Sequence, residues 1–276
     1  MRPVRNRSAA LAIPLCGLCF AVSTLGLGDV AVAQSTGATT RPDPARAKEA
    51  KRTPGQENAG GRFEVHVLNP SGEYAQIDTT LALKTVGVLT HGSPEEKLKV
   101  IAQIRKQPEK YAPPVLYLLS NVLFQMGDKD EAAFWFYAGQ LRARFDANRC
   151  AEPSARAAVA ELNDQYGQII NKYTFTEKPA MLDDLVPRVV DWDRKTAHNY
   201  DHRWINLHGM GAVMSAMGEA LPPTALSLPK EQWEQIAERT RSDYLAGFRM
   251  VKEMMKTPEY REALERLKSR EAQGKR

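Results

Sequence analysis

The chain has 276 residues and a net charge of +5, from 38 basic and 33 acidic side chains. Charges of both signs are interleaved, as in Glu95-Glu96-Lys97. This pattern predicts a mixed, solvated surface and argues against a nucleic-acid partner.

The first 33 residues have the parts of a secretory signal peptide: a basic start, an apolar stretch over 9–27 and small residues before a cleavage site. The alternative is an uncleaved membrane anchor, since the apolar stretch is nearly long enough to span a bilayer. Pro14 and the Ala-Val-Ala site favour cleavage before Gln34. We therefore expect a periplasmic or secreted protein, with a net charge of +3 and no stable membrane insertion after cleavage. The residues of this motif are Arg2, Arg5, Arg7 and Ala31-Val32-Ala33.

Cleavage would leave Cys150 as the only cysteine. A lone thiol cannot form an intramolecular disulfide, so packing alone must stabilise the fold. Cys150 could pair with another molecule, but free cysteines are usually buried, and burial is our prediction.

Residues 34–62 are rich in Thr, Ala, Gly, Pro and charge, which predicts a disordered linker. A single helical domain is expected over 63–272, with a short β element at its start. Residues 63–68 alternate as a half-buried strand does, and Asn69-Pro70-Ser71-Gly72 predicts a turn. A second short strand over 73–77 would complete this element.

Two helices are predicted next. Asp78-Thr79-Thr80 can cap a helix that runs to Leu89, and Ser93-Pro94-Glu95-Glu96 has the pattern of a capping box with proline in the first turn. The second helix carries Leu98, Ile101 and Ile104 and must end or kink before Pro108.

Residues 113–145 predict an antiparallel helical hairpin. Gly127 can end the first helix with a positive φ, and Asp128 or Asp130 can cap the second. The hairpin resembles one tetratricopeptide repeat unit, through Leu116-x2-Leu119-Ser120-x2-Leu123, Ala132-x3-Phe136 and the small Gly139. It departs from that family where Leu replaces Trp, Ser replaces Gly and Leu replaces Tyr, and only one copy is visible.

The resemblance implies a protein-binding groove on the first helix, lined by Tyr117, Asn121 and Phe124. The alternative is that these side chains contact the preceding helix, over 98–107. Residues 134–137, Phe-Trp-Phe-Tyr, predict a helix that is buried on all sides. Arg142, Arg144 and Arg149 follow; they suit a helix C-terminus and could also meet an acidic partner.

Further helices are predicted from Glu152-Pro153-Ser154 to Tyr173, over 182–193 and over 229–255, where apolar residues recur at helical spacing. A charged, solvated helix follows Thr257-Pro258. The predicted fold class is mainly α: an irregular helical bundle or an array of helical hairpins.

One segment has the residue types of a metal site. His198 and His202 are four residues apart, which on a helix places both rings on one face, and Asp201 or His208 could complete the ligand set. A metal-dependent hydrolase would also need a base, such as Asp191 or Asp193. The alternative is a connecting segment whose His and Asp side chains bond backbone groups.

Immediately after it, His208, Met210, Met214 and Met217 have the spacing of soft copper ligands. The small residues between the methionines instead favour a tightly packed buried helix in which methionine fills gaps. We therefore predict no cofactor and no metal.

No nucleophile elbow, phosphate-binding loop or cysteine metal framework occurs in the sequence. We therefore predict an exported, non-enzymatic protein-binding domain that acts as a cell-envelope adaptor or assembly factor. An immunity protein that neutralises an interbacterial toxin is an equal alternative, and a metal-dependent hydrolase is the third.

Overall fold

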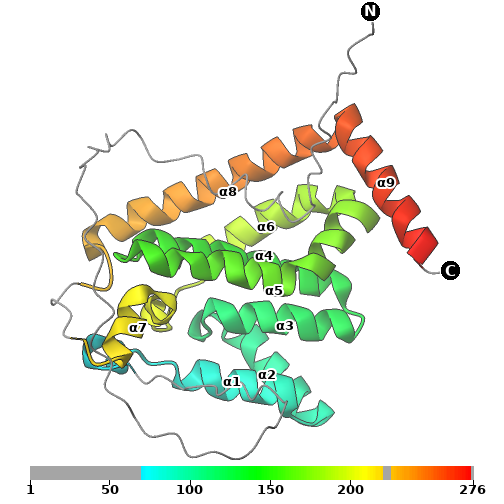
Figure 1. Ribbon diagram of the computed structural model, residues 1–276. Helices are drawn as coiled ribbons and strands as arrows, with labels where there is room; N and C mark the ends of the chain where they lie inside the picture. Colours follow the sequence, from blue (N-terminus) through cyan, green and yellow to red (C-terminus); the bar gives the residue numbers. More distant parts are fainter. Residues whose placement is uncertain (1–69, 220–224, 275–276) are drawn as a thin grey trace, which may run out of the picture. The chain divides into compact units, whose positions relative to one another are not determined.

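The computed structural model describes residues 70–219 and 225–274, and these residues are mainly α-helical (Figure 1). Within them, the only β interaction is an isolated antiparallel bridge between Cys150 and Ser227. The predicted signal peptide, the predicted linker and the predicted strand over 63–68 lie outside the described residues. The helices are α1 (Thr80–His91), α2 (Pro94–Lys106), α3 (Pro113–Gln125), α4 (Lys129–Arg149), α5 (Ala158–Lys172), α6 (Leu182–Lys195), α7 (Met210–Ala216), α8 (Trp233–Met255) and α9 (Pro258–Gly274).

The predicted strand over 73–77 is wrong. The chain there forms a 3-10 helix, Gly72–Gln76, which begins at a glycine with φ of 60°. The preceding Ser71 does not pair with a strand: its backbone N–H donates to the hydroxyl of Ser215 in α7, at 2.8 Å.

The capping box at the start of α2 is confirmed. The Ser93 hydroxyl accepts from the Glu96 backbone at 3.3 Å, and the Glu96 carboxylate accepts from the Ser93 backbone at 2.7 Å. Ile101 and Ile104 are buried, as expected, but Leu98 is 54% exposed. Leu98 lies beside the buried face of α2 rather than on it, because that face is centred on the other two residues.

The helical hairpin of α3 and α4 is also confirmed. Gly127 has φ of 90°, and the backbone N–H of Asp128 donates back to Leu123 at 3.0 Å, which closes α3. The predicted side-chain cap is absent: Asp128 pairs with Arg105, and the Asp130 carboxylate accepts from Tyr173 and Lys178. Gly139 lets the helices approach closely, because a Cβ there would lie 3.2 Å from Cβ of Leu116.

Helix α4 forms the centre of the fold. It packs against α3, α5, α6 and α8 (Figure 1), and nearly every residue from Ala132 onward is buried. The aromatic run 134–137 therefore belongs to the core, as predicted. A helix enclosed on all sides needs no polar face, which explains the absence of amphipathic spacing in α4.

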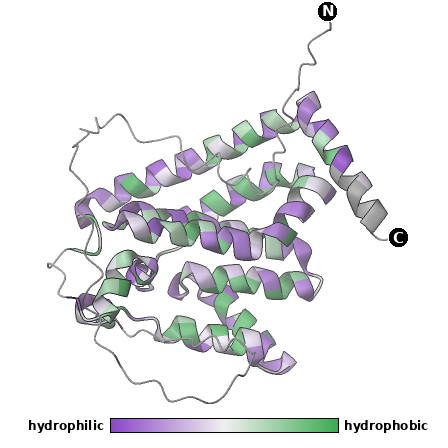
Figure 2. Ribbon diagram, in the orientation of Figure 1, coloured by the Kyte–Doolittle hydropathy of each residue, from purple (hydrophilic) through white to green (hydrophobic). Residues whose placement is uncertain are grey.

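The later helices follow the predicted patterns with shifted ends. A 3-10 turn, Pro153–Ala157, precedes α5, and a π-helical turn, Tyr173–Glu177, follows it. Along α8, hydrophobic and hydrophilic residues alternate (Figure 2); Tyr244 and Val251 of its apolar stripe are buried. The described side chains of α9 are mostly exposed, as expected. No helix in the described part of the chain is both long and apolar enough to cross a membrane.

Candidate functional site

Two of the predicted partner-binding residues lie inside the protein. Tyr117 has no exposed surface; its hydroxyl donates to Asn163 at 2.8 Å and its ring meets the edge of Phe136 at 5.3 Å. Arg142 is also fully buried. Neither can face a partner in this fold, because α5 covers the first residue and α6 the second.

The other three predicted residues are partly accessible. Asn121 accepts a hydrogen bond from Gln125 one turn later. The Phe124 ring meets the edge of the Tyr173 ring, with 5.9 Å between centroids. Arg144 lies over the ring of Tyr244 at 5.5 Å. These contacts lie within the domain, so the residues contribute at most the edge of a binding surface.

Arg142 belongs to a buried cluster of charges. Its guanidinium lies 3.3 Å from the Asp193 carboxylate and donates to the backbone oxygens of Thr196 and Ala197. Arg241 of α8 binds the same carboxylate at 2.8 Å, and His198 lies 3.0 Å from it. Burial alone would raise the pKa of Asp193, but His198 and the two guanidinium groups outweigh it and lower that pKa.

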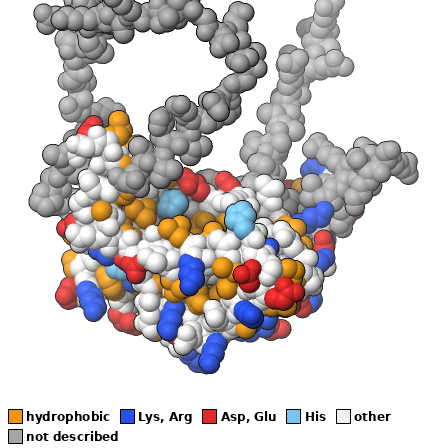
Figure 3. Space-filling model, turned by 90° about the horizontal axis from the view of Figure 1, so that it is seen from below, with side chains coloured by type: hydrophobic (Ala, Val, Ile, Leu, Met, Phe, Trp, Pro, Cys, Tyr) orange, Lys and Arg blue, Asp and Glu red, His pale blue; other side chains and the backbone are white. Residues whose placement is uncertain are grey.

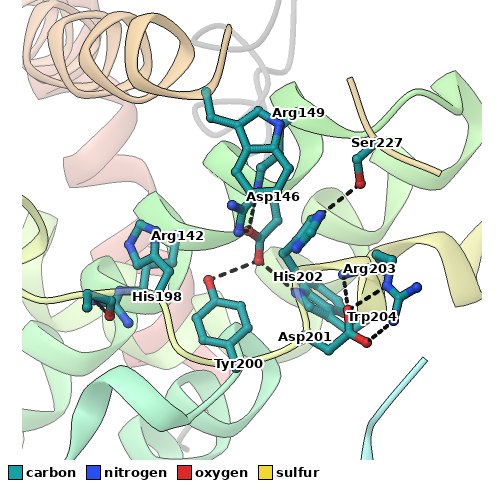
Figure 4. Close-up of polar contacts among 12 residues, drawn as sticks. Arg142, Asp146, Arg149, His198, Tyr200, Asp201, His202, Arg203, Trp204 and Ser227 are labelled. Atoms are coloured by element: carbon teal, nitrogen blue, oxygen red, sulfur yellow. Dashed lines mark hydrogen bonds and ion pairs between the residues drawn. The ribbon is translucent and has the colours of Figure 1, made fainter. Parts of the chain in front are cut away.

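A second cluster surrounds Asp146 near the C-terminal end of α4 (Figure 4). Its carboxylate accepts from Arg149 at 2.6 Å, from the Tyr200 hydroxyl at 3.0 Å and from the Trp204 indole at 2.8 Å. Burial, and then the charge of Asp146, hold the pKa of Tyr200 well above its ordinary value. The carboxylate is saturated with donors and fully buried, so this cluster joins α4 to the segment that follows α6.

A third group fixes the segment before α1. The Asp201 carboxylate accepts from Arg203 at 2.7 Å and from the backbone N–H of Asp78 at 3.0 Å. Burial raises the pKa of Asp201, but these donors outweigh it and lower the value to about 2. The arginine also reaches the carbonyl oxygen of Gln76 at 3.2 Å.

The histidines of the predicted metal site have separate partners (Figure 4). His198 lies in a loop, beside Asp193. His202 is the first residue of a 3-10 helix, His202–His208, and its ring lies 2.7 Å from the Ser227 hydroxyl. His208 lies 3.7 Å from Glu161 of α5. The helix that would have aligned His198 and His202 is absent, and the described residues contain no group of three His, Cys, Asp or Glu side chains able to hold a metal.

Burial of Cys150 is confirmed: the free thiol is 1% exposed and donates to Asn206 at 3.1 Å. Burial also raises its pKa. Both properties keep the sulfur protonated and out of contact with solvent, so in this conformation it cannot pair with another molecule.

The segment with methionine spacing differs from its prediction. Met210 is 58% exposed and Met217 is 67% exposed, so α7 is not a buried helix with methionines filling gaps. Its small residues do pack inward, where Ala212 and Ser215 are buried. The error concerned which face of the helix meets the core.

Exposed leucines on α1 and α2 form a feature that sequence analysis missed. Leu83 is 67% exposed, Leu98 54% and Leu81 42%. The view of the α1 and α2 side in Figure 3 shows hydrophobic side chains on the surface, interspersed with charged side chains of both signs. The signal was present in the sequence, since α1 has more apolar positions than one buried face can hold.

Comparisons with known proteins identify no relative: no family model, curated protein or solved structure matches this chain.

Proposed function

We propose that this protein is an exported protein-binding module of the cell envelope, an adaptor or assembly factor, and that the outer surface of α1 and α2 contacts its partner. The observation that carries the proposal is the exposure of Leu83 and Leu98 on neighbouring helices. A large apolar side chain gains its transfer free energy only when something covers it, about 1.5–3 kcal/mol for a leucine.

The charges around these leucines indicate what kind of segment would bind. Helix α1 has no acidic residue, and Lys84 is exposed on it. On α2, Lys99 and Lys106 are exposed, and the exposed acids Glu95 and Glu96 are confined to its first turn. A partner segment with both apolar and acidic side chains suits this surface, because the apolar groups supply affinity and the charges speed and orient the encounter.

The interior supports a scaffold role. The buried acids Asp146 and Asp193 have their donors within the domain, so the two clusters hold helices together. A rigid body of this kind presents a preformed surface and avoids the entropy cost of ordering a loop on binding.

Photo-crosslinking in the native host tests the proposal. A photoreactive amino acid is placed at Leu83 or Leu98, and at Asp184 of α6 as an exposed control position. We expect a discrete adduct from the first two positions and none from the third, with the partner identified by mass spectrometry. Substitution of Lys84 and Lys99 by Glu should then weaken binding of the purified partner.

The identity of the adduct separates the two functional alternatives. An envelope component indicates an adaptor or assembly factor, whereas a toxin encoded beside this chain indicates an immunity protein. Absence of an adduct at both leucine positions, with the protein correctly exported, would contradict the proposal.

A further inference from the structure

The exposed side of α7 and of Met217, the residue that directly follows it, carries thioether and valine side chains. Met210 and Met217 are more than half exposed, Val213 is 39% exposed and Met214 is half-buried. The opposite side holds the helix in place through Ala212 and Ser215. No charged residue occurs in α7 itself.

The three methionines share one face. With about 100° of rotation per residue, Met214 lies about 40° to one side of Met210 and Met217 about 20° to the other. The same geometry separates neighbouring members of the set by about 4.5–6 Å along the axis. Methionine has three rotatable bonds beyond Cα, so its sulfur atoms can converge across such distances.

The N-terminal end of α7 is held rigidly, which pre-positions this face. The Glu152 carboxylate accepts from the backbone N–H of Gly211 at 2.8 Å and from the Ser154 hydroxyl at 2.5 Å. That hydroxyl accepts in turn from the backbone N–H of Met210 at 3.0 Å. Gly209 permits the arrangement, because a Cβ there would lie 2.5 Å from the carboxylate.

Within the described residues no methionine is fully buried, and the core is filled mainly by aromatic, leucine, isoleucine and valine side chains. Met181 and Met255 are partly buried against that core, whereas Met126, Met250 and Met254 are exposed, as Met210 and Met217 are. The distinguishing feature of the α7 region is that three methionines, Met210, Met214 and Met217, follow one another on one side of a short segment. Thioether sulfur is a soft ligand that selects monovalent copper over hard or borderline cations such as magnesium and zinc.

We propose that Met210, Met214 and Met217 form a three-thioether site for Cu(I) on the surface of α7. His208 is not a member, because its ring packs on Trp204 at 5.7 Å and lies 3.7 Å from Glu161. The site shares no residue with the proposed partner surface on α1 and α2, and the ion binds without a change of oxidation state.

Competition titration tests the site. The protein, purified in its native processed form, is titrated anaerobically with Cu(I) held by a chromophoric chelator, and Ag(I) serves as a redox-inert substitute. We expect one ion per chain and sulfur-only ligation in the X-ray absorption spectrum. Mutation of residues that merely hydrogen-bond to a metal ligand typically lowers metal affinity by about 10–100-fold. Loss of a ligand itself should cost at least as much, so each Met→Leu substitution should weaken binding by about tenfold or more.

The matched control uses two other exposed methionines, Met250 and Met254, which lie one turn apart on α8. Replacing both by Leu should leave the affinity unchanged, whereas replacing the three α7 methionines should abolish binding. Leucine preserves size and helix propensity, so circular dichroism should show both variants folded. The proposal is overturned if the native protein takes no Cu(I) from the chelator, or if the α7 triple variant binds as the native protein does.

Discussion

Replacing Asp193 by Asn should destabilise the domain strongly. The side chain is 3% exposed, and it neutralises Arg142, which is fully buried, and Arg241, which is 9% exposed. Asn has nearly the same shape but no charge, so two buried guanidinium groups would lose their shared counter-charge. Breaking a buried ion pair in this way costs about 3–5 kcal/mol, a large part of the roughly 5–15 kcal/mol that stabilises a typical domain.

Urea unfolding followed by helical circular dichroism and tryptophan fluorescence measures this loss. The matched control is Asp191→Asn, two residues earlier on the same helix. Asp191 is 56% exposed and pairs with Lys195, and an exposed pair of this kind contributes about 0–1 kcal/mol. If Asp193→Asn and its control differ by less than about 1 kcal/mol, the cluster does not hold α4, α6 and α8 together.

Three further predictions concern single sites. Gly139→Ala should destabilise by about 1–3 kcal/mol, because the new methyl group crowds α3, whereas Gly87→Ala, with open space around it, should stabilise by about 0.5–1 kcal/mol; thermal unfolding of both decides. Burial, and then the charge of Arg149, lower the pKa of His202 to about 4. The unfolded chain therefore takes up this proton first, and stability should fall as the pH falls from about 6.5 to about 4. The pKa shift allows a loss of unfolding free energy of about 3 kcal/mol at most, and partial exposure of the ring reduces this to about 1–2 kcal/mol. In His202→Gln, the denaturant midpoint should lack this pH-dependent loss. Cys150 should react with a thiol reagent only as fast as the domain opens, and a rate equal to that of an exposed thiol would contradict its burial.

Local signals in the sequence predicted the helices well. The capping box at Ser93, the glycine stop at Gly127 and the apolar stripe of α8 each depend on residues a few positions apart, and each is present. The close approach of α3 and α4 at Gly139 was also predictable. A residue without a side chain allows two helix backbones to come close, and this depends on the glycine alone.

Long-range partners explain what could not be predicted. Tyr117 and Arg142 looked like surface residues because their partners, Asn163 and Asp193, are 46 and 51 positions away. The orientation of α7 likewise depends on a distant partner: Ser215 on its inward face accepts a hydrogen bond from Ser71, 144 positions earlier in the chain. A single sequence carries no sign of such pairings, because neither residue of a pair is unusual in its own neighbourhood.

The enclosure of α4 by four other helices has a consequence for how the protein opens. Amide protons of α4 can exchange with deuterium only when its neighbours separate, so their protection should approach the full unfolding free energy. Those of α9, which contacts α8 and whose described side chains are mostly exposed, should exchange through local fraying. A protease would accordingly shorten the chain from its C-terminal end long before it reached the central helix.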